Sequence, residues 1–120
     1  MPLVASIIAA FGLVVVGGVI LSINHAVQNT TLRRNDLVGI RTSQTKKSDR
    51  AWQVAHEAAL TPMRITAYLS FACAALTVVI GAFAHSEALI VVAIGLSYVA
   101  SLAALTWACR VAHRAAAAVQ

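Results

Sequence analysis

The chain has 120 residues, of which 60% are apolar and only 11% charged, and its formal net charge is +5. Soluble proteins average about 25% charged residues, and a folded chain of this size still exposes much of its surface. A water-soluble fold could not hide so many apolar side chains, and a disordered chain would contain fewer of them. Two cysteines are too few for a disulfide scaffold. The composition therefore indicates a small integral membrane protein.

The first predicted membrane span covers residues 3–23, which contain no ionisable side chain. About 20 apolar residues are what a helix needs to cross roughly 30 Å of hydrocarbon. The segment lacks the basic start of a secretory signal peptide, and its apolar run is longer than such peptides have, so we expect a retained anchor. Gly12, Gly17 and Gly18 make this span thin, which favours packing against another helix.

Two further spans are predicted over residues 65–84 and 88–108, which are equally free of ionisable side chains. Because so few residues separate them, they must form an antiparallel helical hairpin. Pro62 lies where the earlier of these helices is expected to begin, with Thr61 as its N-cap. The sequence thus predicts an all-α membrane protein with three transmembrane helices in one domain over residues 1–120.

A stripe of small residues follows one face of the third span. Small residues allow helices to approach closely, either within one chain or against a second copy or a larger partner. Cys73 and Cys109 lie on antiparallel helices at different depths and are expected to be unpaired packing residues. The members of the stripe are Ala93, Ser97, Ser101, Ala104 and Ala108.

All nine basic residues lie either between the first and second spans or after the third. The positive-inside rule assigns that side to the cytoplasm, with the N-terminus outside. We expect this charge to contact anionic lipid headgroups rather than nucleic acid. The basic residues are Arg33, Arg34, Arg41, Lys46, Lys47, Arg50, Arg64, Arg110 and Arg114.

The loop of residues 24–62 is the one long polar segment. Ser48 is a good N-cap for a short helix from about Asp49 to Leu60. Trp52 and His56 share one face of that helix with Ala55 and Ala59, whereas the charged residues lie towards the other face. This pattern predicts an amphipathic helix in the membrane interface, with Trp52 at the depth of the lipid headgroups.

The same loop contains a spaced set of residues that begins at Asn35, continues through Gly39, Arg41 and Thr42, and ends at Trp52 and His56. This set resembles the motif of the SdpI family of bacterial membrane proteins. The family motif has roughly the form N-x-x-[apolar]-G-[IV]-R-T-P-x-T. A Trp follows it, and a His comes four residues after the Trp. Ser43 stands where the family usually has Pro, Lys46 replaces an apolar residue, and Ala58 and Ala59 replace Gly. The matching residues are Asn35, Gly39, Ile40, Arg41, Thr42, Thr45, Trp52 and His56.

This resemblance implies a location in the bacterial inner membrane. It also implies a non-enzymatic role in immunity or signal sensing. The best-known member of the family protects its producer from a secreted toxic peptide, and it holds a transcriptional repressor at the membrane. A protein of this kind would act by binding a peptide, lipid or protein partner. The alternative is a structural accessory subunit of a larger membrane enzyme or transporter, docked through its small-residue faces.

Arg41 is the candidate ligand-binding residue, because a guanidinium flanked by the hydroxyls of Thr42 and Thr45 can hold a phosphate or carboxylate. The alternative is that it caps a helix or pairs with Asp36 or Asp49. For Asn35 and Asp36 we favour a turn held by side-chain hydrogen bonds.

His56 is expected to make a structural hydrogen bond rather than to titrate or bind a metal, since no second ligand stands at a suitable spacing. No nucleophile with a base, no paired carboxylates and no glycine-rich phosphate loop occur in the sequence. The spans also lack the ionisable groups that coupled transport needs. We therefore predict no catalytic residues, no metal and no cofactor.

Overall fold

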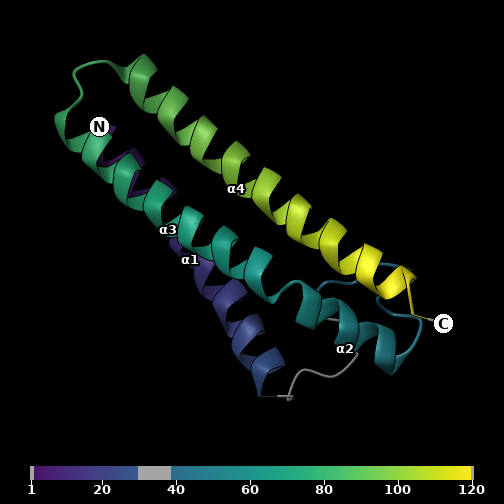
Figure 1. Ribbon diagram of the computed structural model, residues 1–120. Coiled ribbons are helices and arrows are strands. Elements are labelled where there is room, and N and C mark those ends of the chain that lie inside the picture. Colours follow the sequence, from purple (N-terminus) through teal and green to yellow (C-terminus); the bar gives the residue numbers. More distant parts are fainter. Residues whose placement is uncertain (1, 30–38, 120) are drawn as a thin grey trace.

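The computed structural model describes residues 2–29 and 39–119 (Figure 1). Within them the chain forms four helices: α1 (Pro2–Gln28), α2 (Asp49–Ala58), α3 (Leu60–Phe83) and α4 (Glu87–Ala117). Helices α1, α3 and α4 are long and apolar enough to cross a membrane. The molecule measures 56 × 22 × 22 Å, so it is longer than the roughly 30 Å hydrocarbon core. The predicted all-helical fold, with three spans and a short helix between the first two, is confirmed.

The three long helices alternate in direction along the length of the molecule. Helix α3 runs back against α1, and α4 returns alongside α3 (Figure 1). One end, here called the hairpin end, carries the start of α1 and residues 84–86 between α3 and α4. The opposite end, here called the loop end, carries residues 39–48, α2 and the last turns of α4. The hairpin predicted from the short connection at His85 and Ser86 is confirmed.

The helices extend beyond the predicted spans, because the apolar run marks only the part of a helix that lies in hydrocarbon. Helix α1 continues past residue 23 to Gln28, and α4 continues past residue 108 to Ala117. In the added part of α1, the Asn24 amide is buried and its Nδ2 donates to the Leu60 carbonyl oxygen over 2.8 Å. This hydrogen bond fastens the end of α1 to the start of α3.

The prediction that Thr61 caps α3 is wrong. Helix α3 begins at Leu60, two residues before Pro62, because Ala59 is both the C-cap of α2 and the N-cap of α3. The Ala59 amide donates to the Ala55 carbonyl and the Met63 amide donates to the Ala59 carbonyl, so helical hydrogen bonding continues across the junction. Pro62 then lies in the first turn of α3, where its missing amide hydrogen does no harm.

Helix α4 packs on α3 through buried hydroxyl groups. Ser70 Oγ donates to Ser101 Oγ over 3.1 Å, and Thr77 Oγ1 and Ser97 Oγ lie 3.2 Å apart. Such pairs satisfy polar groups that lipid cannot satisfy, and they let the helices approach closely. Ser97, Ser101 and the buried Ala108 all belong to the predicted small-residue stripe, so these members of the stripe pack inside the chain.

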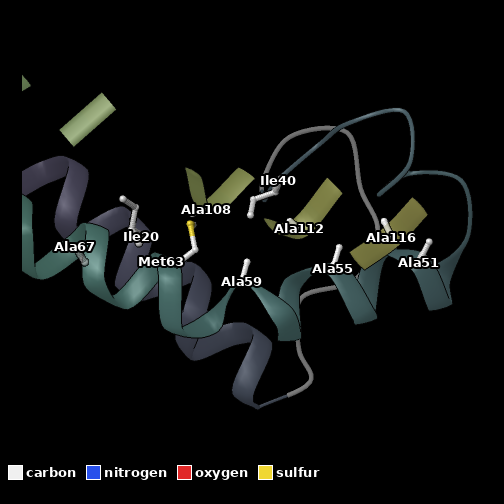
Figure 2. Packing of buried hydrophobic residues seen from close by; sticks show 10 residues of the cluster. All are labelled: Ile20, Ile40, Ala51, Ala55, Ala59, Met63, Ala67, Ala108, Ala112 and Ala116. Atoms are coloured by element: carbon white, nitrogen blue, oxygen red, sulfur yellow. The ribbon is translucent and has the colours of Figure 1, made fainter. Parts of the chain in front are cut away.

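Helix α2 packs against the loop end of α4 through alanines at four-residue spacing (Figure 2). Side chains this small let the two helices lie close together, so α2 rests on protein along its apolar face. Trp52, on that same side of α2, is only 1% exposed. Trp52 therefore contacts protein rather than lipid headgroups, and its predicted depth in the membrane interface stays a prediction. The alanines are Ala51, Ala55 and Ala59 with Ala108, Ala112 and Ala116, each no more than 1% exposed.

A candidate binding site at the motif loop

Helix α2 begins with the predicted cap and presents two aromatic rings to the motif loop, residues 39–45. Ser48 has an extended backbone, and its Oγ accepts a hydrogen bond from the Ala51 amide over 3.0 Å. One helical turn separates Trp52 from His56, and their ring centroids are 4.3 Å apart with planes inclined by 35°. Both side chains are buried, and the motif loop packs on their rings.

His56 is held by two backbone groups. Its Nδ1 lies 2.8 Å from the Trp52 carbonyl oxygen, and its Nε2 accepts a hydrogen bond from the Ile40 amide over 2.9 Å. Because a carbonyl only accepts and an amide only donates, the proton must be on Nδ1 and the ring must be neutral. Burial lowers the His56 pKa below its ordinary value, and the bond to Trp52 opposes this shift in part. His56 therefore has a structural role, as the sequence predicted.

Gly39 allows the loop to come close to the two rings. Its φ of 107° is one that residues with a Cβ rarely adopt. A Cβ at this position would lie 2.8 Å from His56 Nε2 and 2.9 Å from a ring carbon of Trp52. The family glycine is thus required both by its backbone conformation and by the lack of space.

Thr45 connects the two halves of the loop. Its side chain is fully buried, and its Oγ1 donates to the Ile40 carbonyl oxygen and accepts from the Thr42 amide, each over 2.8 Å. The Thr42 hydroxyl in turn accepts from the Thr45 amide over 3.2 Å. The backbone groups here have no partners in a helix or sheet, and these reciprocal hydrogen bonds to threonine hydroxyls satisfy them instead. The same bonds fix the backbone around Arg41.

Residues 39–48 are also attached to α4 and to the residues that follow it. The Thr42 hydroxyl lies 2.8 Å from His113 Nδ1, and Lys47 Nζ donates to the Val119 carbonyl oxygen over 2.7 Å. His113 could not be identified from the sequence, because the family motif ends at His56 and the contact joins residues 71 positions apart. Only the return of α4 to the loop end brings this histidine to the motif.

An apolar groove lies beside the loop and has a volume of about 440 Å³. Residues from α1, α3, α4 and the loop line it, and helices α1 and α4 contact each other much less than either contacts α3. Arg41 and Thr42 belong to its lining at the loop end. The lining residues are Val15, Val16, Val19, Ile20, Ile23, Gly39, Ile40, Arg41, Thr42, Met63, Leu105 and Cys109.

The guanidinium of Arg41 is exposed and forms no hydrogen bond or ion pair with any residue that the structure describes. The alternative pairing with Asp49 is therefore not formed. Asp36, the other alternative partner, and the family residue Asn35 lie outside the described residues. A rigid loop thus presents a positive charge, without an acidic partner among the described residues, at one end of an apolar groove. Such an arrangement suits a ligand with an anionic group and an apolar part.

The remaining members of the motif form one packed unit. Gly39, Thr42, Thr45, Trp52 and His56 contact one another directly or through Ile40, whereas Arg41 is exposed. In residues 2–29 and 39–119 no cluster of His, Cys, Asp or Glu side chains could hold a metal ion. Cys73 and Cys109 are both free thiols.

The sequence pattern of the SdpI/YfhL protein family matches residues 31–108, which include the motif loop, α2, α3 and most of α4. No curated protein and no solved structure matches the chain. The family match covers well over half of the 120 residues and contains every motif position described above. The chain therefore belongs to the SdpI/YfhL protein family.

Proposed function

We propose that this chain is a non-enzymatic immunity or signal-sensing protein of the bacterial inner membrane, which acts by binding a peptide, lipid or protein partner at its loop end. The observation that carries the proposal is the placement of Arg41. A network of buried hydrogen bonds fixes the backbone on both sides of it, while its guanidinium stays exposed and without a partner among the described residues. Such rigidity favours binding, because the site loses little freedom when a ligand arrives.

The chemistry of the loop supports binding rather than catalysis. His56 is the buried histidine of the motif, and both of its ring nitrogens are already engaged by backbone groups. It therefore cannot accept a proton from a substrate without breaking the loop. The rival role, that of a structural subunit docked through the small-residue stripe, is less favoured, because Ser97, Ser101 and Ala108 are buried within the chain.

The proposal includes the orientation of the chain in the membrane, with the loop end in the cytoplasm. The described Lys and Arg residues lie towards the loop end, and the hairpin end has none. The positive-inside rule then puts the loop end in the cytoplasm. A partner of the Arg41 site would meet the protein there, at the inner face of the membrane.

The test compares Arg41→Lys and Arg41→Ala in a strain whose own copy of the gene is deleted. Cells are exposed to spent medium from the parent strain, and survival and genome-wide transcription are normalised to the amount of each variant. Lys keeps the charge but loses the planar fork, so the affinity for an anionic ligand should fall by about 10- to 150-fold, as for one charge-assisted hydrogen bond. We therefore expect lower survival and a weaker transcriptional response per molecule of the Arg41→Lys variant.

Arg50→Lys and Arg50→Ala are matched controls, because Arg50 is exposed on α2 at the same end of the molecule but does not line the groove. These two variants should behave as the unaltered protein. If deletion of the gene changes neither survival nor transcription, the proposed function is wrong. Unaltered activity of both Arg41 variants would instead remove Arg41 from the site.

A further inference from the structure

We infer that the groove beside the loop is a binding site for an anionic phospholipid, with one acyl chain between α1 and α4 and the headgroup phosphate at Arg41. This inference deepens the proposed function and rests on it, because the proposed function gives the side of the membrane that the loop faces. The arguments are the length, the lining and the charge of the groove.

The length of the groove corresponds to one leaflet. On α1 its lining runs from Val15 to Ile23, which at 1.5 Å per residue is about 12 Å along the helix axis. Half of a hydrocarbon core of about 30 Å is ~15 Å. A groove that begins at the loop and ends near the middle of the bilayer suits an acyl chain. A partner helix would instead need a contact surface along the whole span.

The lining is apolar and open towards the lipid. Val15 and Val19 are 46% and 54% exposed on the spanning part of α1, and Leu105 and Cys109 line the groove from α4. Met63 of α3 contributes to the lining between these two helices. The volume of about 440 Å³ falls within the range of about 300–1,000 Å³ that is typical of ligand sites.

The charge selects the headgroup. Arg41 and Thr42 line the groove where it meets the loop, so a phosphate above an inserted chain would meet a guanidinium and a nearby hydroxyl. An arginine binds phosphate through two parallel N–H donors, and the Arg41 guanidinium has no acidic partner among the described residues. A zwitterionic headgroup offers the same phosphate but carries a cation that offsets its charge, so the site should prefer a lipid with a net negative charge.

The test is photo-cross-linking of the full chain in phosphatidylcholine vesicles. A small fraction of the lipid carries a photoreactive group in its acyl chain, with either a phosphatidylglycerol or a phosphatidylcholine headgroup, and labelled residues are mapped by mass spectrometry. We expect the phosphatidylglycerol probe to label Val15, Val19 and Leu105 about fivefold more than the phosphatidylcholine probe. This ratio corresponds to ~1 kcal/mol for one basic side chain at a membrane surface. Arg41→Ala should bring the ratio close to one, and Arg41→Lys should lower it less.

Two controls separate the groove from general attraction to a basic protein. Arg50→Ala removes the same charge from the same end and should leave the ratio at the groove unchanged. Trp107 is 45% exposed on α4 near the level of Leu105 but does not line the groove, and its labelling should not respond to Arg41→Ala. Circular dichroism of each variant in the same vesicles checks that the helices are retained.

Four outcomes would overturn the inference. Equal labelling of the groove by both probes would show that the headgroup is not recognised. An equal loss of selectivity in Arg41→Ala and Arg50→Ala would show diffuse surface attraction. Labelling that falls as the protein-to-lipid ratio rises would mean that a second copy fills the groove, and absence of label would mean that lipid does not enter it. The measurement involves no toxin and no signalling readout, so its failure can be told apart from failure of the proposed function.

Discussion

The Nε2 atom of His56 accepts a hydrogen bond from the backbone amide of Ile40 over 2.9 Å, and this contact connects α2 to the motif loop. The other ring nitrogen is bound to the Trp52 carbonyl, so the ring has no freedom to turn. Because Arg41 directly follows Ile40, the histidine that ends the family motif fixes the position of the arginine near its beginning. Two residues 16 positions apart in the sequence are thus held together in one rigid unit.

This contact predicts a loop that loosens in acid. Protonation of His56 would put a second N–H opposite the Ile40 amide and break the hydrogen bond. The folded-state pKa lies below the ordinary value of 6.5, so the unfolded loop takes up the proton first. The stabilisation is therefore complete above about pH 6.5 and is lost as the pH falls through the folded pKa. Hydrogen exchange of the Ile40 amide, corrected for its intrinsic rate, should therefore become faster as the pH falls. His85→Asn at the hairpin end should keep this behaviour, and exchange independent of pH would contradict the assigned tautomer.

Gly39→Ala should loosen the loop without unfolding the spans. A residue with a Cβ at a φ of 107° is strained by about 1–3 kcal/mol, and the new methyl group would meet both rings of α2. Trypsin cleavage after Arg41, Lys46 and Lys47 in detergent micelles measures the opening directly, and it should become faster. Gly95→Ala is the matched control, because no atom lies within 4 Å of its added Cβ. Equal cleavage rates in the two variants would argue against a strained position.

Thr45→Val should destabilise the loop although it preserves the size of the side chain. It removes one donor and one acceptor and leaves the buried Ile40 carbonyl and Thr42 amide without their partner, at a cost of about 1–3 kcal/mol. Thr45→Ser keeps the hydroxyl and should lose less. Ser43→Ala changes an exposed hydroxyl in the same loop and should have no effect. The trypsin assay ranks the three, and a Val variant as resistant as the Ser43 variant would contradict this role of Thr45.

Gly17→Ala and Gly18→Ala should differ although the two glycines are neighbours. The added Cβ at Gly17 would lie 2.5 Å from the nearest ring carbon of Phe71 on α3, whereas the one at Gly18 meets no atom within 4 Å. We expect a loss of about 1–3 kcal/mol for the former, as for other overpacked contacts, and little change for the latter. Unfolding of the purified protein by a denaturing detergent gives both values. A Gly18 variant as unstable as the Gly17 variant would count against this helix crossing.

The orientation can be tested with single cysteines after Cys73 and Cys109 are replaced by Ala. His85→Cys at the hairpin end should react with an impermeant thiol reagent added to intact cells. Gln44→Cys in the motif loop should react only after the cells are opened. His85 is preferred to Ser86 as the labelling position, because Ser86 Oγ caps α4 through the Leu89 amide. The reverse pattern would put the loop end outside and would exclude a cytoplasmic partner.

The membrane spans and the short helix could be predicted from the sequence, because the forces that set them act locally. Residues 3–23, 65–84 and 88–108 must be helical wherever they lie in lipid, since each backbone group needs a partner within its own segment. Ser48 marks the start of α2 because its hydroxyl accepts from an amide only three residues away. The start of α3 could not be predicted in this way, because Leu60 continues a hydrogen-bond pattern that begins in α2.

The family motif identified most members of the candidate site, and the tertiary structure then decided what each one does. Trp52 has the spacing of an interfacial residue, yet it is buried, because the loop covers it and α2 lies on α4. His113 and the groove depend on the point at which α4, after crossing the length of the molecule, comes back to the loop. Hydropathy and capping are properties of neighbouring residues and can be read from the sequence. Contacts between residues 71 positions apart depend on how the helices pack, and only the folded chain determines that.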